Sequence, residues 1–219
     1  MIAEKKIKKE RIDKLLVDNN FFESRSVAQR FIMAGQVLVN DIVISKSGEL
    51  VNPESEIRIK NPVKKYVSRG GEKLEIALKE FNLDFTGKSI LDIGISTGGF
   101  SDCALQNGAE KIIGVDVGYG QTDLKIRNNP RVTLIERSNA RNLNLNEKFD
   151  FIICDVSFIS ITKLLDVFIL HLKENGQLVI LIKPQFEAGK ENISKGGIVR
   201  DKKIHNKIID SLKEIFYEK

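Results

Sequence analysis

The chain has 219 residues, of which 42% are hydrophobic and 30% are charged, a balance that is ordinary for a soluble globular protein. Its net charge of +5 and its pI of about 9.1 are compatible with a polyanionic partner but do not require one. The spacing of its two cysteines excludes a disulfide framework and a metal site built from them, so reduced thiols are expected. A signal peptide and an apolar run of membrane-spanning length are both missing, so we expect a cytoplasmic protein with no membrane partner.

Residues 1–60 are expected to form a small α+β domain. Apolar residues recur at helical spacing in two segments, of which the second begins after Ser24, a candidate N-cap, and ends at Gly35. The sequence "VLVNDIVI" then predicts two strands joined by a tight turn, and a further short strand is expected at 56–59.

This N-terminal segment, and its "AGQVLVND" hairpin above all, resembles the RNA-binding domain first described in ribosomal protein S-four. The resemblance implies that structured RNA binds to the basic face of the two helices and the adjoining strand. Arg and Lys at helical spacing can hold RNA by its phosphates and shape, although a charged face taken alone is more often only solvated. The matched positions are Arg11, Lys14, Ser24, Arg25, Gln29, Arg30 and Lys46.

The segment "NPVKKY" at 61–66 is interpreted as an interdomain linker, and Lys64, Lys65 and the following Arg69 are further candidates for RNA contact. Residues 67–219 are expected to form the catalytic domain. Helices are predicted at 72–81, 100–106, 161–170 and 202–216, and strands at 89–93, 111–116, 132–136, 149–155 and 177–182. This alternation predicts an α/β fold with a doubly wound, mostly parallel sheet that binds ligands at the carboxyl ends of its strands.

The segment "SILDIGISTGGF" predicts a buried strand, a glycine-rich loop and the start of a helix. Its spacing, Asp-x-Gly-x-x-x-Gly-Gly, differs from the Gly-x-Gly-x-x-Gly of dinucleotide-binding folds, which leaves nicotinamide binding as the rival. The loop resembles the first motif of class I (Rossmann-like) methyltransferases, and this resemblance implies S-adenosylmethionine as the cofactor. Asp116, at the end of the next strand, is placed for the ribose hydroxyls, and Asn139 for the adenine. The candidate cofactor residues are Asp92, Gly94, Ser96, Thr97, Gly98, Gly99, Phe100, Asp116, Val117 and Asn139.

Three charged residues are the catalytic candidates: Lys73 near the start of a helix, and Asp155 and Lys183 at the ends of two strands. Methylation of a ribose 2′-hydroxyl needs positioning and stabilisation of a developing alkoxide, which a lysine can supply. We expect Lys183 beside the hydroxyl, Asp155 orienting it and Lys73 tuning the electrostatic field.

The same three residues match the first members of the Lys–Asp–Lys–Glu tetrad of FtsJ-like 2′-O-methyltransferases. Together with "KYVSRGGEKL", "DVGYGQ", "CDVSFIS", "KPQFEAGK" and "KGGIVRD", they make the whole chain similar to the TlyA/haemolysin A family. That resemblance implies ribosomal RNA or ribosomal subunits as partner and cytidine 2′-hydroxyls as methyl acceptors. The family continues by two more strands, which carry the glutamate, so this chain is expected to lack them. The alternative hypothesis is therefore a catalytically inactive RNA- or ribosome-binding protein. Nothing in the sequence indicates the pore that the haemolysin label suggests.

Several other residues have plainer interpretations. Cys154 precedes Asp155 on a strand and is expected in the core, not as the nucleophile of a carbon-5 methyltransferase. "DVSF" lacks both prolines of the Asp-Pro-Pro-Tyr loop of amino-methylating enzymes. His171 and His205 are expected at the surface or at helix ends. Residues 187–197 are either a lid or a plain connection.

Overall fold

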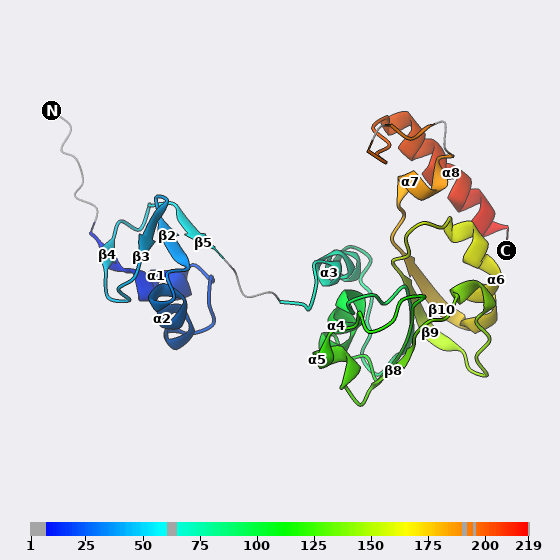
Figure 1. The fold of residues 1–219 in the computed structure, drawn as a ribbon, viewed down its shortest axis with the longest axis horizontal. Coiled ribbons are helices and arrows are strands. Elements are labelled where there is room, and N and C mark those ends of the chain that lie inside the picture. Colours follow the sequence, from blue (N-terminus) through cyan, green and yellow to red (C-terminus); the bar gives the residue numbers. More distant parts are fainter. Residues whose placement is uncertain (1–7, 61–64, 190–191, 195, 219) are drawn as a thin grey trace. The chain divides into compact units, whose positions relative to one another are not determined.

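The computed structural model describes residues 8–60, 65–189, 192–194 and 196–218. The chain divides into two compact units, residues 1–63 and 64–219 (Figure 1). The predicted linker at 61–66 lies at this division, and residues 61–64, with the candidate Lys64, are outside the described part of the chain. Among the described helices, none has the length and apolarity that crossing a membrane requires.

The N-terminal unit packs two helices against short antiparallel strands. Its elements are β1 (Glu10–Arg11), α1 (Ile12–Asp18), α2 (Arg25–Met33), β2 (Val37–Val39), β3 (Ile42–Ile44), β4 (Leu50–Val51) and β5 (Ile57–Ile59). Strand β2 pairs with both β3 and β5, and β1 pairs with β4. Ile12, Leu16 and Ile32 are fully buried between these elements. This small α+β unit agrees with the prediction for residues 1–60.

Local signals account for the shape of this unit. Ser24 caps α2, because its Oγ accepts a hydrogen bond from the Val27 N–H at 3.4 Å. Gly35 ends the helix region with φ +66°, and Asn40 and Asp41 turn the hairpin with φ of 50° and 62°.

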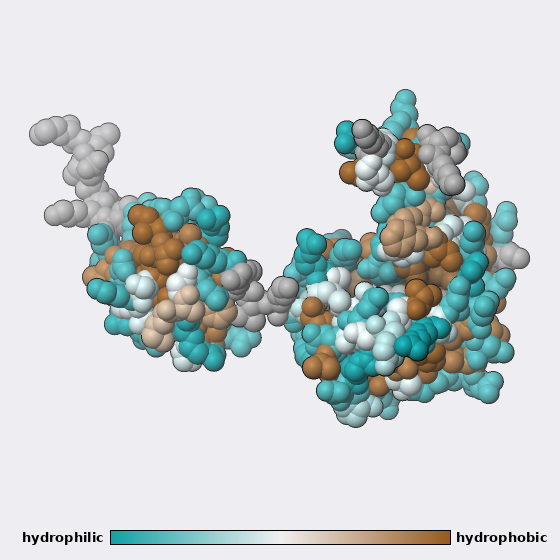
Figure 2. Space-filling model, in the orientation of Figure 1, coloured by the Kyte–Doolittle hydropathy of each residue, from teal (hydrophilic) through white to brown (hydrophobic). Residues whose placement is uncertain are grey.

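Strand β3 is an edge strand, and Figure 2 shows apolar residues gathered over β2 and β3 on the N-terminal unit. Ile42 and Val43 of β3 are exposed there. An edge strand leaves one row of backbone N–H and C=O groups without a strand partner, so this apolar edge is open to solvent.

The C-terminal unit is built on a five-stranded parallel sheet in the order β10-β9-β6-β7-β8. The strands are β6 (Ser89–Ile93), β7 (Lys111–Val115), β8 (Val132–Ile135), β9 (Phe149–Cys154) and β10 (Leu172–Ile180). The chain builds the sheet outward from β6 to β8 and then returns to the other side of β6 with β9. Such a reversal leaves a crevice beyond the carboxyl ends of the two central strands. The predicted doubly wound α/β sheet is confirmed.

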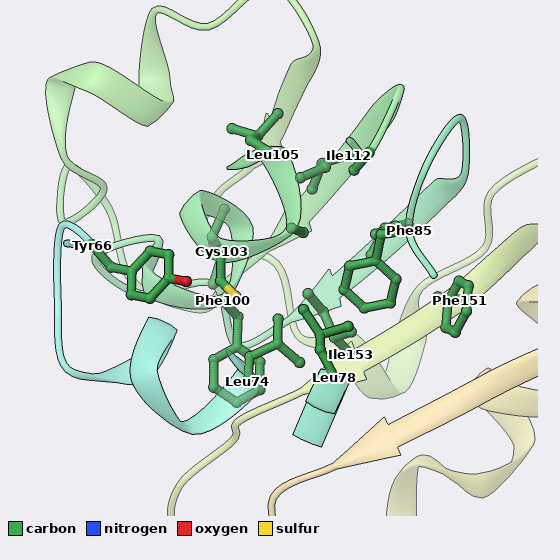
Figure 3. Packing of buried hydrophobic residues seen from close by; sticks show 14 of the residues in the cluster. Tyr66, Leu74, Leu78, Phe85, Phe100, Cys103, Leu105, Ile112, Phe151 and Ile153 are labelled. Carbon is green, nitrogen blue, oxygen red and sulfur yellow. The ribbon is translucent and has the colours of Figure 1, made fainter. Parts of the chain in front are cut away.

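Helices cover both faces of this sheet, with α3 and α4 on one face and α6 on the other (Figure 1). The helices are α3 (Gly70–Glu80), α4 (Gly99–Gln106), α5 (Leu124–Arg127), α6 (Leu165–His171), α7 (Pro184–Glu187) and α8 (Lys202–Tyr217), with short 3₁₀ turns at Ala140–Asn142 and Ile161–Leu164. Figure 3 shows the core under α3 and α4, where the rings of Phe85 and Phe151 meet at 4.6 Å between centroids. Alternate residues of the strands, such as Ile90 and Leu91, face these two different cores.

One expectation about this unit is corrected, and one is narrowed. Lys183 does not end a strand: β10 stops at Ile180, and Lys183 is the N-cap of α7. His171 is at a helix end, as predicted, but it is fully buried and not at the surface. The Leu145 N–H donates to its Nε2 at 2.9 Å, and its Nδ1 lies 2.8 Å from the Val167 carbonyl oxygen, so both ring nitrogens are satisfied inside the protein.

Candidate active site

The glycine-rich turn between β6 and α4 depends on close approach of backbone to backbone. Gly94 has φ +86°, and a Cβ at this position would lie 2.9 Å from the carbonyl oxygen of Asp155. Gly98 has φ +92° and is the N-cap of α4. A side chain at Gly94 would meet both an unfavourable dihedral angle and a steric clash, so glycine is required there.

Asp92, which the sequence assigned to the cofactor, lies in the interior between β6 and α4. It is fully buried, and its Oδ2 accepts a hydrogen bond from the Ser101 Oγ at 2.6 Å. Its Oδ1 has no hydrogen-bond partner among the described residues. Burial raises the pKa of this carboxyl to about 7. Asp92 lines neither of the two cavities described below. It lies behind the glycine-rich turn and supports it from the interior.

Asp116 follows β7 and connects two loops. Its Oδ2 accepts from the Ser96 N–H at 2.8 Å, and its Oδ1 accepts from the Gly118 N–H at 2.7 Å. Each carboxylate oxygen has a second lone pair, so both can still accept a hydrogen bond from a ligand.

The first cavity has a volume of about 910 Å³ and lies beyond the ends of β6, β7 and β9. Such a volume is in the range of cofactor and substrate sites. The cofactor candidates that line this cavity are Gly94, Ser96, Asp116, Val117 and Asn139. Asn139 also caps a 3₁₀ turn, because its Oδ1 accepts from the Arg141 N–H at 3.1 Å.

Several residues of this first cavity were not predicted from the sequence. Gln121, Ser138 and Phe158 line it from loops, Arg141 from the 3₁₀ turn at Ala140–Asn142, and Phe186 from α7, all in segments that follow strands. Their place after strand ends was a usable signal, because ligands in such folds bind there. A position after a strand does not reveal which side chains face the cavity.

The second cavity, of about 700 Å³, adjoins the first and shares Gly94, Ser96, Asp155 and Ser157 with it. Thr97, Gly99 and Phe100, which were assigned to the cofactor, line this second cavity and not the first, and Gly98 lines neither. Arg69, Glu72, Lys73 and Lys183 bring charge to its wall. Ser68 and Glu72 were not foreseen.

The three catalytic candidates meet at the wall of the second cavity. Lys183 Nζ lies 2.6 Å from Asp155 Oδ1 as an ion pair and donates a hydrogen bond to Ser157 Oγ at 2.8 Å. Lys73 Nζ lies 4.0 Å from Asp155 Oδ2. The contact between Lys183 Nζ and Asp155 Oδ1 does not have the geometry of a hydrogen bond. Asp155 Oδ1 therefore has no hydrogen-bond partner among the described residues. The side chain of Lys73 is 51% exposed and that of Lys183 is 20% exposed, so Lys183 is held more tightly.

Cys154 is confirmed as a core residue. Its side chain is fully buried among the residues that face α6. Burial raises the pKa of its thiol to about 12. A thiol that stays protonated at neutral pH is a poor nucleophile.

The RNA-binding candidates differ in how their side chains are held. Arg11, Arg25 and Gln29 hydrogen-bond to the buried Asp13, which the sequence analysis did not single out. Lys14 is exposed beside Glu10, and Ser24 acts as a helix cap. In the described part of the chain, no ion pair or side-chain hydrogen bond holds Arg30, Lys46 or Arg69, whereas Lys65 pairs with Glu75 at 2.8 Å.

Known proteins resemble the chain in both units. A family model described as FtsJ-like methyltransferase matches residues 66–219, and a model of the S4 domain matches residues 10–57. A Bacillus subtilis protein provisionally named as the rRNA methyltransferase YqxC is 46% identical over 206 residues, which cover 92% of this chain and 73% of that protein. The 16S/23S rRNA (cytidine-2′-O)-methyltransferase TlyA of Mycobacterium tuberculosis is 36% identical over 195 residues, which cover 87% of this chain and 73% of TlyA.

The similarity extends to three dimensions. A solved structure of a Streptococcus thermophilus protein with a provisional hemolysin name is 42% identical and has a TM-score of 0.68, with 95% of this chain and 78% of that chain covered. The chain therefore belongs to the FtsJ-like methyltransferases of the TlyA/haemolysin A family, with an S4 domain preceding the methyltransferase domain.

Proposed function

We propose that the protein transfers a methyl group from S-adenosylmethionine to ribose 2′-hydroxyls of ribosomal RNA, on cytidines, in the cytoplasm. The observation that carries this proposal is the meeting of Lys73, Asp155 and Lys183 beside Gly94, at the border of two adjoining cavities. The TlyA relative, named for cytidine 2′-O-methylation of rRNA, supports this choice of acceptor.

The first cavity fits the cofactor. The turn at Gly94 packs against the backbone of Asp155 with no room for a Cβ, so the path of this loop along the cavity wall is fixed. Asp116 keeps a free lone pair on each carboxylate oxygen for the two ribose hydroxyls. The side chain of Val117 is 71% exposed at the cavity wall and offers an apolar contact for the adenine. When bound, S-adenosylmethionine would supply an electrophilic methyl group on its sulfonium, with the neutral thioether S-adenosylhomocysteine as a good leaving group.

The second cavity suits the acceptor nucleotide. Arg69, Lys73 and Lys183 outnumber Glu72 and Asp155 on its wall, so its charge favours a phosphate-bearing substrate. Lys183 is oriented by Asp155 and Ser157, and its ammonium can stabilise the negative charge that develops on the 2′-oxygen. As the bond from this oxygen to the methyl carbon forms, the hydroxyl proton would be released to solvent water. Because the ammonium is already in place, little reorganisation is needed during the reaction.

The test is transfer of labelled methyl groups from S-adenosylmethionine to unmodified ribosomal subunits. We expect Lys183→Ala to lower the rate by roughly 100-fold or more, the usual cost of losing one transition-state donor. The equilibrium affinity for S-adenosylmethionine should stay within about twofold, since Lys183 lines only the second cavity. Lys173→Ala is the matched control, because Lys173 pairs with Asp150 and lines neither cavity.

The position of the label separates this function from its rivals. A methyl group on the 2′-oxygen protects the following phosphodiester from alkaline hydrolysis, whereas a methyl group on a base does not. Label recovered only on bases, or an unchanged rate in Lys183→Ala, would rule out the proposed chemistry. Cofactor and RNA binding without any transfer by the wild-type chain would favour the inactive RNA-binding alternative.

A further inference from the structure

A buried carboxylate lies at the centre of the basic surface on the N-terminal unit. Asp13, in the first turn of α1, has no exposed surface. It accepts hydrogen bonds from Arg11 Nε at 3.0 Å, Arg11 Nη2 at 2.9 Å, Arg25 Nη2 at 2.7 Å and Gln29 Nε2 at 2.9 Å. The three donors come from β1 and from one face of α2, so a single carboxylate joins the elements that the RNA-binding surface comprises.

These contacts use only part of each arginine. Arg11 turns one edge of its guanidinium to both carboxylate oxygens, and Arg25 uses one terminal nitrogen. The two side chains remain 49% and 53% exposed. A guanidinium carries several N–H donors in a rigid plane, so the donors that Asp13 does not engage are held in set directions toward solvent.

The other cations among the RNA-binding candidates of this unit are held differently. Among the described residues, Lys14 pairs with Glu10 and Asp18, at 3.3 Å and 3.6 Å, and such surface pairs constrain a side chain weakly. Arg30 and Lys46 have no side-chain partner among the described residues. The hydrogen bond from Arg11 keeps the pKa of Asp13 below its usual range, so the carboxylate remains charged at neutral pH.

We propose that Asp13 is a positioning residue for RNA binding, which orients Arg11, Arg25 and Gln29 as a preset group of donors for the phosphates of structured RNA. This inference rests on the proposed function. Flexible arginines lose conformational freedom when they bind, and side chains that are oriented beforehand lose less. Asp13 therefore raises RNA affinity although it places a negative charge in a surface that binds a polyanion.

The direction in which one substitution changes the affinity for RNA tests this claim. If only net charge mattered, Asp13→Asn would remove a negative charge and tighten RNA binding. If Asp13 positions the donors, the same change should weaken RNA binding. We expect the Kd of the full chain for an unmodified rRNA transcript to rise about tenfold in Asp13→Asn, the effect of losing one placed arginine contact. Asp18→Asn makes the same charge change on the same helix at an exposed site, and it should bind as tightly as the wild type or more tightly.

A double-mutant cycle separates positioning from a purely structural role. If Asp13 acts through Arg25, then Asp13→Asn should cost less affinity in an Arg25→Ala background than in the wild type. Steady-state kinetics should show a raised KM for RNA and an unchanged kcat, because the catalytic candidates are in the other unit. Additive losses in the cycle, or tighter binding by Asp13→Asn, would overturn the proposal.

Asp13→Asn could unfold the small unit, so circular dichroism and thermal unfolding accompany each measurement. Should it unfold, Arg11→Lys replaces it as the test, since this change keeps the charge at an exposed side chain and removes the planar fork. A loss of about tenfold is again expected, and unchanged affinity would refute positioning. Wild-type RNA binding without methyl transfer would reject the methyltransferase function alone, whereas no RNA binding at all would reject both.

Discussion

The carboxyl group of Asp92 combines complete burial with one hydrogen bond, from Ser101. Burial penalises its charged form and raises its pKa to about 7, well above the value of about 4 in an unfolded chain. Between these two values the folded state binds more protons than the unfolded state. The free energy of unfolding contributed by this group is therefore highest below pH 4 and falls as the pH rises through 7.

We predict that Asp92→Asn is less sensitive to pH than the wild type. The amide cannot ionise and can still accept the hydrogen bond from Ser101, so the variant avoids a loss of up to about 4 kcal/mol between pH 4 and pH 8. Thermal unfolding at several pH values checks this, with the exposed Asp210→Asn as control. Parallel curves for Asp92→Asn and the wild type would contradict the proposed burial effect.

At the level of elements, β6 and β9 bring the glycine-rich turn against the loop that begins at Asp155, after β9. Gly94 is restricted by a positive φ and by the Asp155 carbonyl oxygen, whereas Gly120 has φ +69° and a Cβ added there would meet no atom within 4 Å. The comparison of these two glycines separates backbone strain from steric clash.

We predict that Gly120→Ala costs about 1–2 kcal/mol of stability, from the left-handed conformation alone. Gly94→Ala should cost more and should also weaken S-adenosylmethionine binding, because relief of the clash must move the turn or Asp155. Chemical denaturation and calorimetric titration of the cofactor measure the two effects. Equal stability losses with normal cofactor affinity in both variants would show that close packing at Gly94 is unimportant.

Much of the fold could be predicted from the sequence, because apolar strands bounded by glycine turns are strong local signals. The bounds of β6 were predicted at both ends. Strands β1 and β4 were missed, since two residues carry no periodicity. The burial of His171 was also missed, because its partners, Leu145 and Val167, become neighbours only in the folded protein.

The general position of the site was predicted from the sequence, but its division into two cavities was not. The motifs placed Gly94, Asp116 and Asp155 at strand ends, which the parallel sheet then gathered at one edge. Which side chain faces which cavity depends on strand order and loop packing. That is why Thr97 and Phe100 are found beside the second cavity, and Asp92 in the interior. The roles of these residues stay predictions.

At the level of the whole molecule, the two units have separate hydrophobic cores. Ile12, Leu16 and Ile32 belong to the N-terminal core, and the sheet of the other unit is covered by its own clusters. Units with separate cores can unfold independently, and a ligand stabilises only the unit that it binds.

We predict two transitions in calorimetric unfolding of the full chain. S-adenosylmethionine at about 100 times its Kd should stabilise the larger unit by about 2.7 kcal/mol and leave the unfolding temperature of the smaller unit unchanged. An rRNA transcript should raise the unfolding temperature of the smaller unit. A single transition that shifts as a whole with S-adenosylmethionine would show that the units unfold together.

The position of Asp155 on the wall of both cavities has a consequence for inhibitor design. Under the proposed function, a compound that fills only the first cavity would compete with S-adenosylmethionine. A compound whose tether passes Asp155 would reach the second cavity, where Arg69, Lys73 and Lys183 offer cationic contacts. Its selectivity would then depend on the acceptor side, and an anionic group on that arm would gain most from those side chains.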